Sequence, residues 1–201
     1  MTKSKKKIIA IDIDEVLMPH FQDLIDYYNR LYGTSLTLED NHPKDSSRWG
    51  TPSMKVAIRR VEKFFDTNEF KNSTPFEDSK KAIKILSDNF TLVVITARDE
   101  IIKQTTKNWL EKHFPEFFKE VHFTSMYNLE GKARTKGEVA KSIKADYLVD
   151  DNFDHIIAAY KHGVKGLLFG NYPWSSNVQL PKGVIRANDW NDVLDYFNLQ
   201  C

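Results

Sequence analysis

The segment KKKIIAIDIDEVLMP, Lys5 to Pro19, contains a short apolar run that ends in two carboxylates, Asp12 and Asp14. The run, Ile8–Ile11, is continuous and rich in β-branched residues, which is typical of a parallel strand buried on both faces. In a parallel sheet, ligands bind beyond the carboxyl ends of the strands. The two acids stand at that position, so this strand predicts both a parallel fold and the place of its binding site.

Four more segments of the same type follow, and helical patterns separate most of them. The predicted strands are Phe90–Ala97, Val121–Thr124, Asp146–Asp150 and Gly166–Gly170. The predicted helices are Ile101–His113, Gly137–Ile143, Asp154–Lys161 and Trp190–Phe197. Strands that alternate with helices predict βαβ units with right-handed crossovers, and therefore an α/β fold with a parallel sheet.

The interval between the first two predicted strands is long and breaks this alternation. Phe21–Gly33 and Ser53–Phe65 carry apolar residues at helical spacing, and a turn-rich linker, Asp40–Pro52, lies between them. We expect a small helical cap inserted after the first strand. The expected division is residues 1–18 and 76–201 for the core and residues 19–75 for the cap.

Length and composition bound the class of protein. The 201 residues fit one domain with a modest insertion. Lys and Arg number 29 against 28 Asp and Glu, a balance that gives no electrostatic case for a nucleic-acid polymer or a membrane surface as partner. No apolar run has the length of a membrane span, no secretory segment follows the first lysines, and the single cysteine, Cys201, excludes an internal disulfide framework. We expect a reducing, cytoplasmic compartment, and the sequence leaves a homodimer open.

The predicted fourth strand also ends in acids, Asp150 and Asp151. A lone aspartate at a strand end commonly caps the next helix, and for one Asp-x-Asp motif by itself that interpretation is favoured. Two acidic strand ends at one sheet edge favour a cation site instead. Converging carboxylates raise one another's pKa unless a cation neutralises them. Mg²⁺ prefers oxygen ligands together with water and a substrate phosphate. The sequence therefore predicts a magnesium site at this edge.

A phosphate bound there needs positive charge and hydrogen-bond donors. Thr96 ends the second predicted strand, and Arg98 follows it. Lys136 stands at the predicted start of a helix, where Thr135 and Glu138 have the spacing of a capping box. A lysine in a first helical turn is often merely solvated, which is the simpler interpretation of Lys136 alone. Helix N-termini also attract anions, however, and a lysine there can act as a point charge on phosphate.

Taken in order, these motifs resemble those of the haloacid dehalogenase (HAD) superfamily. The matching positions span most of the chain and are Asp12, Asp14, Thr96, Lys136 and Asp150-Asp151. The resemblance implies a Rossmann-like sheet with a helical C1 cap inserted after the first strand. Within the superfamily, ITAR (Ile95–Arg98), VDDN (Val149–Asn152) and YPW (Tyr172–Trp174) are most similar to the type-C 5′(3′)-deoxyribonucleotidases and their bacterial relatives.

The resemblance also implies a role for each matching residue. Asp12 would be the nucleophile that forms an aspartyl-phosphate, and Asp14 would act as general acid and then general base. Thr96, Ala97 and Lys136 would hold the phosphoryl oxygens. The implied ligands of Mg²⁺ are Asp12, the backbone carbonyl of Asp14, and one or both of Asp150 and Asp151.

The implied cap residues are less well determined by the sequence. An aromatic residue near position 20 packs on the base in the vertebrate enzymes, so His20, Phe21 or Trp49 could contact a nucleobase, with Arg98 as a further substrate contact. The alternative is that Phe21 belongs to a helix core and Trp49 to a packed loop. Glu15 departs from the family, since many relatives carry Gly there.

Three functions remain in competition. The first is a Mg²⁺-dependent phosphomonoester hydrolase that acts on (deoxy)nucleoside monophosphates. The second is a phosphatase for another small phosphorylated metabolite, and the third is a catalytically idle HAD-fold module that binds a nucleotide or a protein. The presence of both a nucleophile and an acid favours the enzymes. Trp174 is interpreted as a packing residue, and His155, which lacks metal-ligand spacing, is assigned no function.

Overall fold

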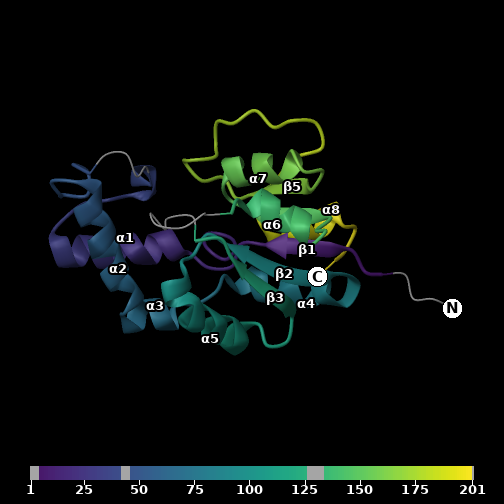
Figure 1. Cartoon of the computed structure of the whole chain (residues 1–201), viewed down its shortest axis with the longest axis horizontal. Helices are drawn as coiled ribbons and strands as arrows, with labels where there is room; N and C mark the ends of the chain where they lie inside the picture. Colours follow the sequence, from purple (N-terminus) through teal and green to yellow (C-terminus); the bar gives the residue numbers. More distant parts are fainter. Residues whose placement is uncertain (1–4, 42–45, 126–133, 201) are drawn as a thin grey trace.

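The computed structural model describes residues 5–41, 46–125 and 134–200. Within these residues, parallel strands form one sheet in the order β3-β2-β1-β4-β5-β6 (Figure 1), which confirms the predicted α/β class. The strands are β1 (Ile8–Ile11), β2 (Thr91–Thr96), β3 (Phe118–Phe123), β4 (Tyr147–Asp150), β5 (Lys165–Phe169) and β6 (Ile185–Ala187). The strand order reverses at β1, which lies between β2 and β4. This is the switch point at which parallel sheets bind ligands.

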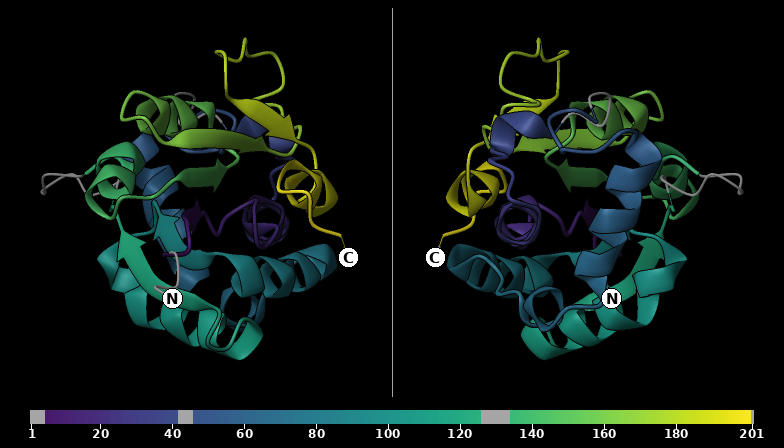
Figure 2. Two further views of the ribbon diagram at one scale, coloured as in Figure 1. Left: turned by 90° about the vertical axis from the view of Figure 1, so that its right-hand side faces the viewer. Right: turned by 90° about the vertical axis from the view of Figure 1, so that its left-hand side faces the viewer.

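Helices cover both faces of the sheet (Figure 2). The helices around the sheet are α4 (Glu77–Asn89), α5 (Lys103–His113), α6 (Lys136–Ser142), α7 (Phe153–Tyr160) and α8 (Trp190–Tyr196). On β1, Ile9 and Ile11 pack with α4, α5 and α8, whereas Ala10 packs with α6 and α7. Successive strand residues point to opposite faces, so a continuous apolar run is what a strand covered on both sides requires.

A second group of helices lies at the end of the sheet, at the left in Figure 1. These are α1 (His20–Tyr32), α2 (Met54–Phe65) and α3 (Asn68–Asn72), called the cap helices below; the single turn η1 (Leu38–Asp40) lies between α1 and α2. They share an apolar, mainly aromatic core, to which Ile102 from the segment after β2 also contributes. The chain leaves the sheet region through Leu17 and returns at Phe76, whose N–H donates to the Leu17 carbonyl at 2.9 Å. The two ends of this long insertion are therefore adjacent.

The structure adds elements that the sequence analysis did not name. α3, α4 and β6 are absent from the predicted elements, and the predicted helix beginning at Ile101 divides into the single turn η2 (Glu100–Ile102) and α5. The sequence of α4 is rich in charge and buries a narrow stripe, with Ala82, Ile83 and Leu86 at its centre. β6 has three residues at the sheet edge. Both signals are too short or too weak for a periodicity argument.

Two apolar residues of the predicted cap pattern are more exposed than expected. Leu31 on α1 is 54% exposed and Ile58 on α2 is 42% exposed. On α2 the buried positions are Ala57 and Phe64 instead. Helical spacing identifies a stripe of a helix, and the neighbouring helices decide which part of that stripe is covered.

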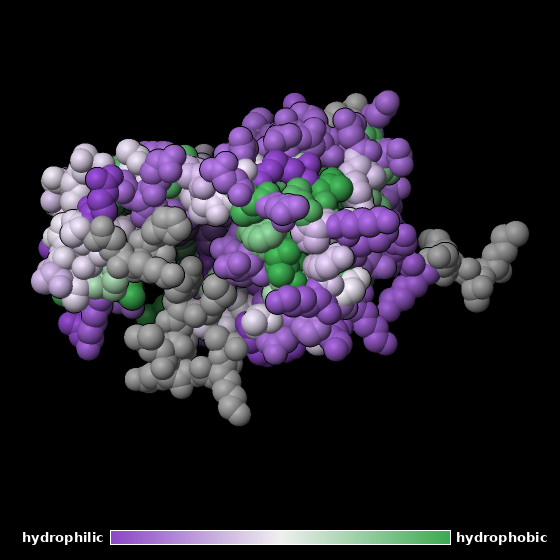
Figure 3. Space-filling view, turned by 90° about the horizontal axis from the view of Figure 1, so that it is seen from above, coloured by the Kyte–Doolittle hydropathy of each residue, from purple (hydrophilic) through white to green (hydrophobic). Residues whose placement is uncertain are grey.

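The described helices include none that is long and apolar enough to cross a membrane. The face of the molecule in Figure 3 is mostly hydrophilic, and its main apolar area lies over the sheet part of the protein.

Candidate active site

Asp12 lies at the carboxyl end of β1, where the chain leaves the sheet. Its backbone N–H donates to the Val149 carbonyl of the neighbouring strand at 3.0 Å, which fixes its height against β4. Its side chain accepts the N–H of Ile13 at 2.8 Å and is almost fully buried. The chain then turns tightly, with the Leu17 N–H donating to the Ile13 carbonyl at 2.8 Å. The apolar strand thus delivers Asp12 to the centre of the sheet edge, as predicted.

Lys136 is the cation that meets Asp12. It is the first residue of α6, and the predicted capping box between Thr135 and Glu138 is present. Its side chain has no solvent exposure, and Nζ lies 2.5 Å from Asp12 Oδ2 and 2.8 Å from Asp150 Oδ2. Lys136 is therefore no solvated helix lysine. It links the acids of two neighbouring strands.

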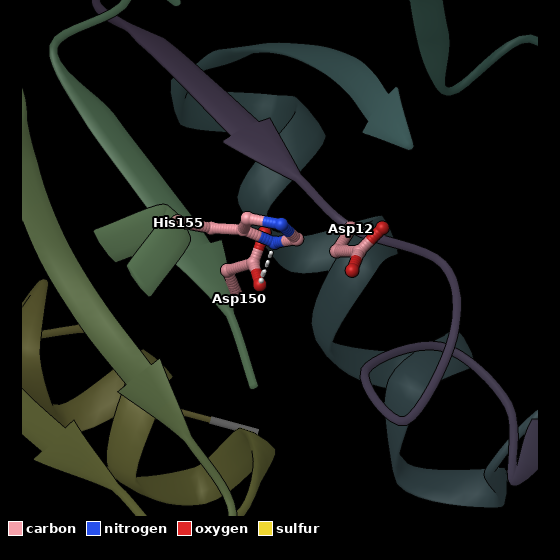
Figure 4. Close-up of side chains that lie close together, drawn as sticks. All are labelled: Asp12, Asp150 and His155. Atoms are coloured by element: carbon pink, nitrogen blue, oxygen red, sulfur yellow. Dashed lines mark hydrogen bonds and ion pairs between the residues drawn. The ribbon is translucent and has the colours of Figure 1, made fainter. Parts of the chain in front are cut away.

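Asp150 ends β4 beside Asp12, and His155 on α7 contacts it (Figure 4). His155 Nδ1 lies 3.1 Å from Asp150 Oδ1, and the N–H of Asn152 donates to the same oxygen at 3.0 Å. Ligand atoms of Asp12, Asp150 and His155 all lie within 4.8 Å of one another. The sequence analysis missed His155. The available signal was Asn152, which caps α7 and so places His155 in its first turn.

Asp14 pairs with Arg98 from the loop after β2. Arg98 Nη2 lies 2.6 Å from Asp14 Oδ1, and Nε lies 3.1 Å from Oδ2. The guanidinium also donates to Thr106 at 3.1 Å and lies over the Phe70 ring of the cap helices, 5.1 Å from its centroid. His20, at the start of α1, lies 3.6 Å from the same Asp14 oxygen. Arg98 and His20 thus connect Asp14 to the cap helices.

Two of the five acids at this edge, Asp14 and Asp150, are held in the ionised form. Burial raises the pKa of Asp14, but the Arg98 guanidinium outweighs it and brings the pKa down to about 2. Burial also raises the pKa of Asp150, and there Lys136 and His155 outweigh it and bring the pKa to about 2.

The other three acids, Asp12, Glu15 and Asp151, have raised pKa values because they are buried close to other carboxyl groups. Burial, with repulsion from Asp150 and Asp14, raises the pKa of Asp12 to about 7 in spite of Lys136. Burial and repulsion from Asp150 and Asp12 raise the pKa of Asp151 well above its usual range. A site that cannot ionise all its carboxyls has room for additional positive charge.

The donor set fits a divalent cation. The acids gathered here are Asp12, Asp14, Glu15, Asp150 and Asp151, against the permanent cations Lys136 and Arg98. These are hard oxygen donors from two strand ends, which suits Mg²⁺ better than a metal that prefers sulfur or several imidazoles.

Thr96 and Ala97 lie at the end of β2, beside β1. Thr96 is fully buried, its hydroxyl accepts the Arg98 N–H at 3.2 Å, and its carbonyl accepts the Thr124 N–H at 3.0 Å. Ala97 is half-buried. Both residues therefore reach the same sheet edge as Asp12.

The three cap candidates differ in position. His20 keeps 15% of its side chain exposed and packs among Phe64, Phe65 and Phe70. Phe21 and Trp49 are each 6% exposed and lie 6.3 Å apart, centroid to centroid, within the cap core. Of the three, His20 is the one that contacts Asp14.

Tyr172 and Trp174 contact the site, although Trp174 was interpreted as a packing residue. Their rings are stacked and nearly parallel, with centroids 4.8 Å apart and an interplanar angle of 1°. Trp174 Nε1 donates to Asp151 Oδ2 at 2.7 Å, and the Tyr172 hydroxyl donates to the Glu15 carbonyl at 2.7 Å. The two aromatic residues thus contact both acidic segments, the one that follows β1 and the one that follows β4. Nothing in the local sequence gives that geometry, because it depends on the loop after β5.

The fold is shared with solved structures of low sequence identity. A haloacid dehalogenase-like family hydrolase from Streptococcus pneumoniae has a TM-score of 0.70 and 14% identity, with 96% of this chain and 98% of that chain covered. YfnB from Bacillus subtilis, solved bound to magnesium, has a TM-score of 0.66 and 10% identity, covering 98% and 100%.

The sequence is similar to those of nucleotidases. A nucleotidase of Clostridium acetobutylicum is 26% identical over 189 residues, covering 92% of this chain and 90% of the relative. A 5′(3′)-deoxyribonucleotidase of Bacillus subtilis is 25% identical over 191 residues, covering 94% and 96%. Residues 6–200 match the family described as "5′ nucleotidase, deoxy (Pyrimidine), cytosolic type C protein". The chain therefore belongs to this nucleotidase family of HAD fold, and it is a phosphoric monoester hydrolase.

Proposed function

We propose that the protein is a Mg²⁺-dependent 5′(3′)-deoxyribonucleotidase that releases phosphate from deoxynucleoside monophosphates through an aspartyl-phosphate on Asp12. The similarity to the 5′(3′)-deoxyribonucleotidase of Bacillus subtilis supports the substrate class. The contact of Lys136 with both Asp12 and Asp150 is the observation that carries the chemistry.

The lysine and the strand ends create a place for a phosphoryl group. Lys136, the Thr96 hydroxyl and the backbone around Ala97 would bind its oxygens at the edge where Asp12 lies. Phosphoryl transfer depends mainly on such positioning and on neutralisation of charge. In this arrangement Asp12, which contacts Lys136, would be the nucleophile.

The covalent step would proceed on Asp12. One of its carboxylate oxygens bonds to phosphorus as the bond to the ester oxygen breaks, and Asp14 donates a proton to the departing alkoxide. Asp14 then takes a proton from a water that attacks the phosphoryl group, which frees Asp12 and releases inorganic phosphate.

Asp14 requires a change of partner to carry a proton. Without substrate, Arg98 keeps its carboxyl ionised, with a pKa of about 2. A substrate phosphate brings negative charge to this edge and competes for the guanidinium, which weakens the hold of Arg98 on Asp14. Arg98 would thereby become a substrate contact.

The acids Asp12, Asp150 and Asp151, with the backbone carbonyl of Asp14, would hold Mg²⁺. When bound, the ion supplies positive charge that neutralises the phosphate and orients it. His155 and Trp174 would keep Asp150 and Asp151 in place through their hydrogen bonds.

A phosphate-release screen tests the proposal. Deoxyribonucleotides with 5′ and 3′ phosphates, ribonucleotides and sugar phosphates are compared with Mg²⁺, with Ca²⁺ and with EDTA, and Asp12→Asn serves as the inactive control. We expect deoxyribonucleotides to have the highest kcat/KM, EDTA to abolish turnover, Mg²⁺ to restore it and Ca²⁺ to restore it poorly because its coordination is larger and looser. A preference for sugar phosphates would instead identify a metabolite phosphatase, and full activity in EDTA would remove the metal from the proposal.

A further inference from the structure

Glu15 occupies an unusual backbone position in the catalytic loop. Its φ is 59°, in the left-handed region that a residue with a Cβ enters at a cost of roughly 1 to 2 kcal/mol. Glycine would carry no such cost. Glu15 is nevertheless only 7% exposed, and both its backbone and its side chain make hydrogen bonds. A strained residue that keeps its side chain buried needs interactions that hold it there.

The side chain of Glu15 reaches the first turn of α1. Its Oε1 accepts the backbone N–H of Phe21 at 2.5 Å. The residue that precedes the helix is Pro19, whose side chain offers no acceptor for the N–H groups of the first turn. A carboxyl oxygen at a helix N-terminus satisfies such a group. Glu15 thus caps α1 from within the catalytic loop.

The backbone of Glu15 is held from the opposite side. The Tyr172 hydroxyl donates to its carbonyl at 2.7 Å, and its own N–H donates to the Met18 carbonyl at 2.8 Å. One residue therefore joins the loop after β5, the turn that carries Asp14, and the first cap helix.

A cavity of about 200 Å³ lies at this junction. It is lined by Glu15, Pro19, Gln22, Leu38, Phe76 and Tyr172. Side chains of the cap region and of the sheet region thus face one another here across open space instead of packing closely. Next to this cavity, the hydrogen bond from Phe21 to Glu15 is a direct polar contact between α1 and the turn that carries Asp14.

We propose that Glu15 is a positioning residue that ties α1 to the catalytic loop and so fixes the cap helices relative to Asp14 for substrate binding. The hydrogen bond from Phe21 to the Glu15 carboxylate is the tie. The consequence for substrate binding rests on the proposed nucleotidase function, whereas the tie itself does not.

Amide hydrogen exchange tests the tie without any substrate. The variants are Glu15→Ala, which removes the acceptor, and Glu15→Gln, which keeps an oxygen at the same place. We expect the Phe21 amide to exchange about tenfold faster in Glu15→Ala, as for the loss of one hydrogen bond, and to stay near wild type in Glu15→Gln. The amide of Tyr28 within α1 is the internal control. Equal Phe21 exchange in all three proteins would overturn the proposal.

Kinetics test the consequence once wild-type hydrolysis has been established. In Glu15→Ala, KM for a deoxyribonucleotide should rise about tenfold, the effect of one lost hydrogen bond, and should rise more than KM for a small aryl phosphate that the cap helices cannot grip. Glu15→Gln should restore the wild-type values. If Glu15→Gln loses kcat as severely as Glu15→Ala, the carboxylate charge acts in the chemistry and the positioning role is wrong.

A second substitution separates the tie from folding. Glu15→Gly suits the positive φ and removes the same acceptor, so it should fold at least as well as Glu15→Ala. Rapid Phe21 exchange in Glu15→Gly together with unchanged global stability would support the tie. Normal Phe21 exchange in this variant would contradict it.

Discussion

Lys136 forms an ion pair with Asp12, in which Nζ lies 2.5 Å from Oδ2 and the lysine side chain has no exposure to solvent. The same ammonium lies 2.8 Å from Asp150. A buried cation between two strand ends determines both the stability of this edge and the charge that an incoming phosphate would meet.

Replacement of Lys136 by Met should destabilise the protein by about 3 kcal/mol or more, because two buried carboxylates lose their cation. Urea unfolding at pH 7 measures the change. Lys141→Met, on the exposed side of the same helix, is the matched control and should have little effect. A similar loss in both variants would show that the helix, and not the buried pair, is responsible.

Asp12→Asn should abolish turnover while the fold is retained. The amide keeps the shape and the acceptor for the Ile13 N–H but cannot act as a nucleophile, so kcat should fall by roughly three or more orders of magnitude. Lys136 still has Asp150 as a partner in this variant, so the protein should remain folded, as circular dichroism can check. Near-normal turnover in this variant would rule out a covalent step on Asp12.

Asp14→Asn should lower kcat most for substrates whose alcohol is a poor leaving group. General acid catalysis contributes about 10² to 10⁴ in rate, and that share is needed for a nucleoside alkoxide but hardly for a nitrophenolate. The measurement is the ratio of kcat for an alkyl phosphate to kcat for an aryl phosphate, compared between wild type and Asp14→Asn. Equal defects on both substrates would leave Asp14 with a purely structural role.

Ala substitutions at His20, Phe21 and Trp49 test base recognition by the cap helices. Stacking on a base contributes about 1 to 3 kcal/mol, so at least one variant should raise KM for a deoxyribonucleotide and leave that for a small aryl phosphate nearly unchanged. His20 is the first to examine, since it is 3.6 Å from Asp14. If all three affect both substrates alike, or lower only thermal stability, they belong to the cap core.

Asp40→Asn should lower stability at neutral pH by roughly 1 to 2 kcal/mol, the range for a lost capping interaction. Hydrogen bonds from Arg48 and Thr37 lower the pKa of Asp40 from 3.8 to about 2. A lowered pKa in the folded state gives stability that is present above about pH 4 and disappears as the pH falls through about 2. The difference between wild type and Asp40→Asn, measured by urea unfolding, should therefore shrink from pH 5 to pH 2. A constant difference would exclude the ionised carboxylate as its source.

The positions of Asp12 and Asp150 could be predicted from the sequence because the parallel sheet determines them. Ile8–Ile11 identifies a doubly covered strand, and the carboxyl ends of parallel strands share one edge, so Asp12 and Asp150 had to meet. Lys136 followed from its capping box, which fixes where α6 begins. These inferences use local patterns and one rule of topology.

The supporting residues could not be placed in this way. His155 contacts Asp150 through the packing of α7, and Trp174 reaches Asp151 from a loop with no regular structure. The hydrogen bond from Phe21 to Glu15 depends on the positive φ of Glu15. A glutamate in a sequence does not predict such a backbone conformation. Such contacts arise from tertiary geometry, which periodicity does not encode.

The hydrogen bond between Phe76 and Leu17 has a consequence for how this enzyme can diversify. The two ends of the inserted segment lie together, so the segment connects to the sheet as a short turn would. A longer insertion would add little to the entropy cost of closing this loop. Helices can therefore be lengthened, shortened or exchanged within the insertion while β1 and β2 keep their register. One stretch of the gene can therefore change while Asp12 and Asp150 keep their places at the sheet edge.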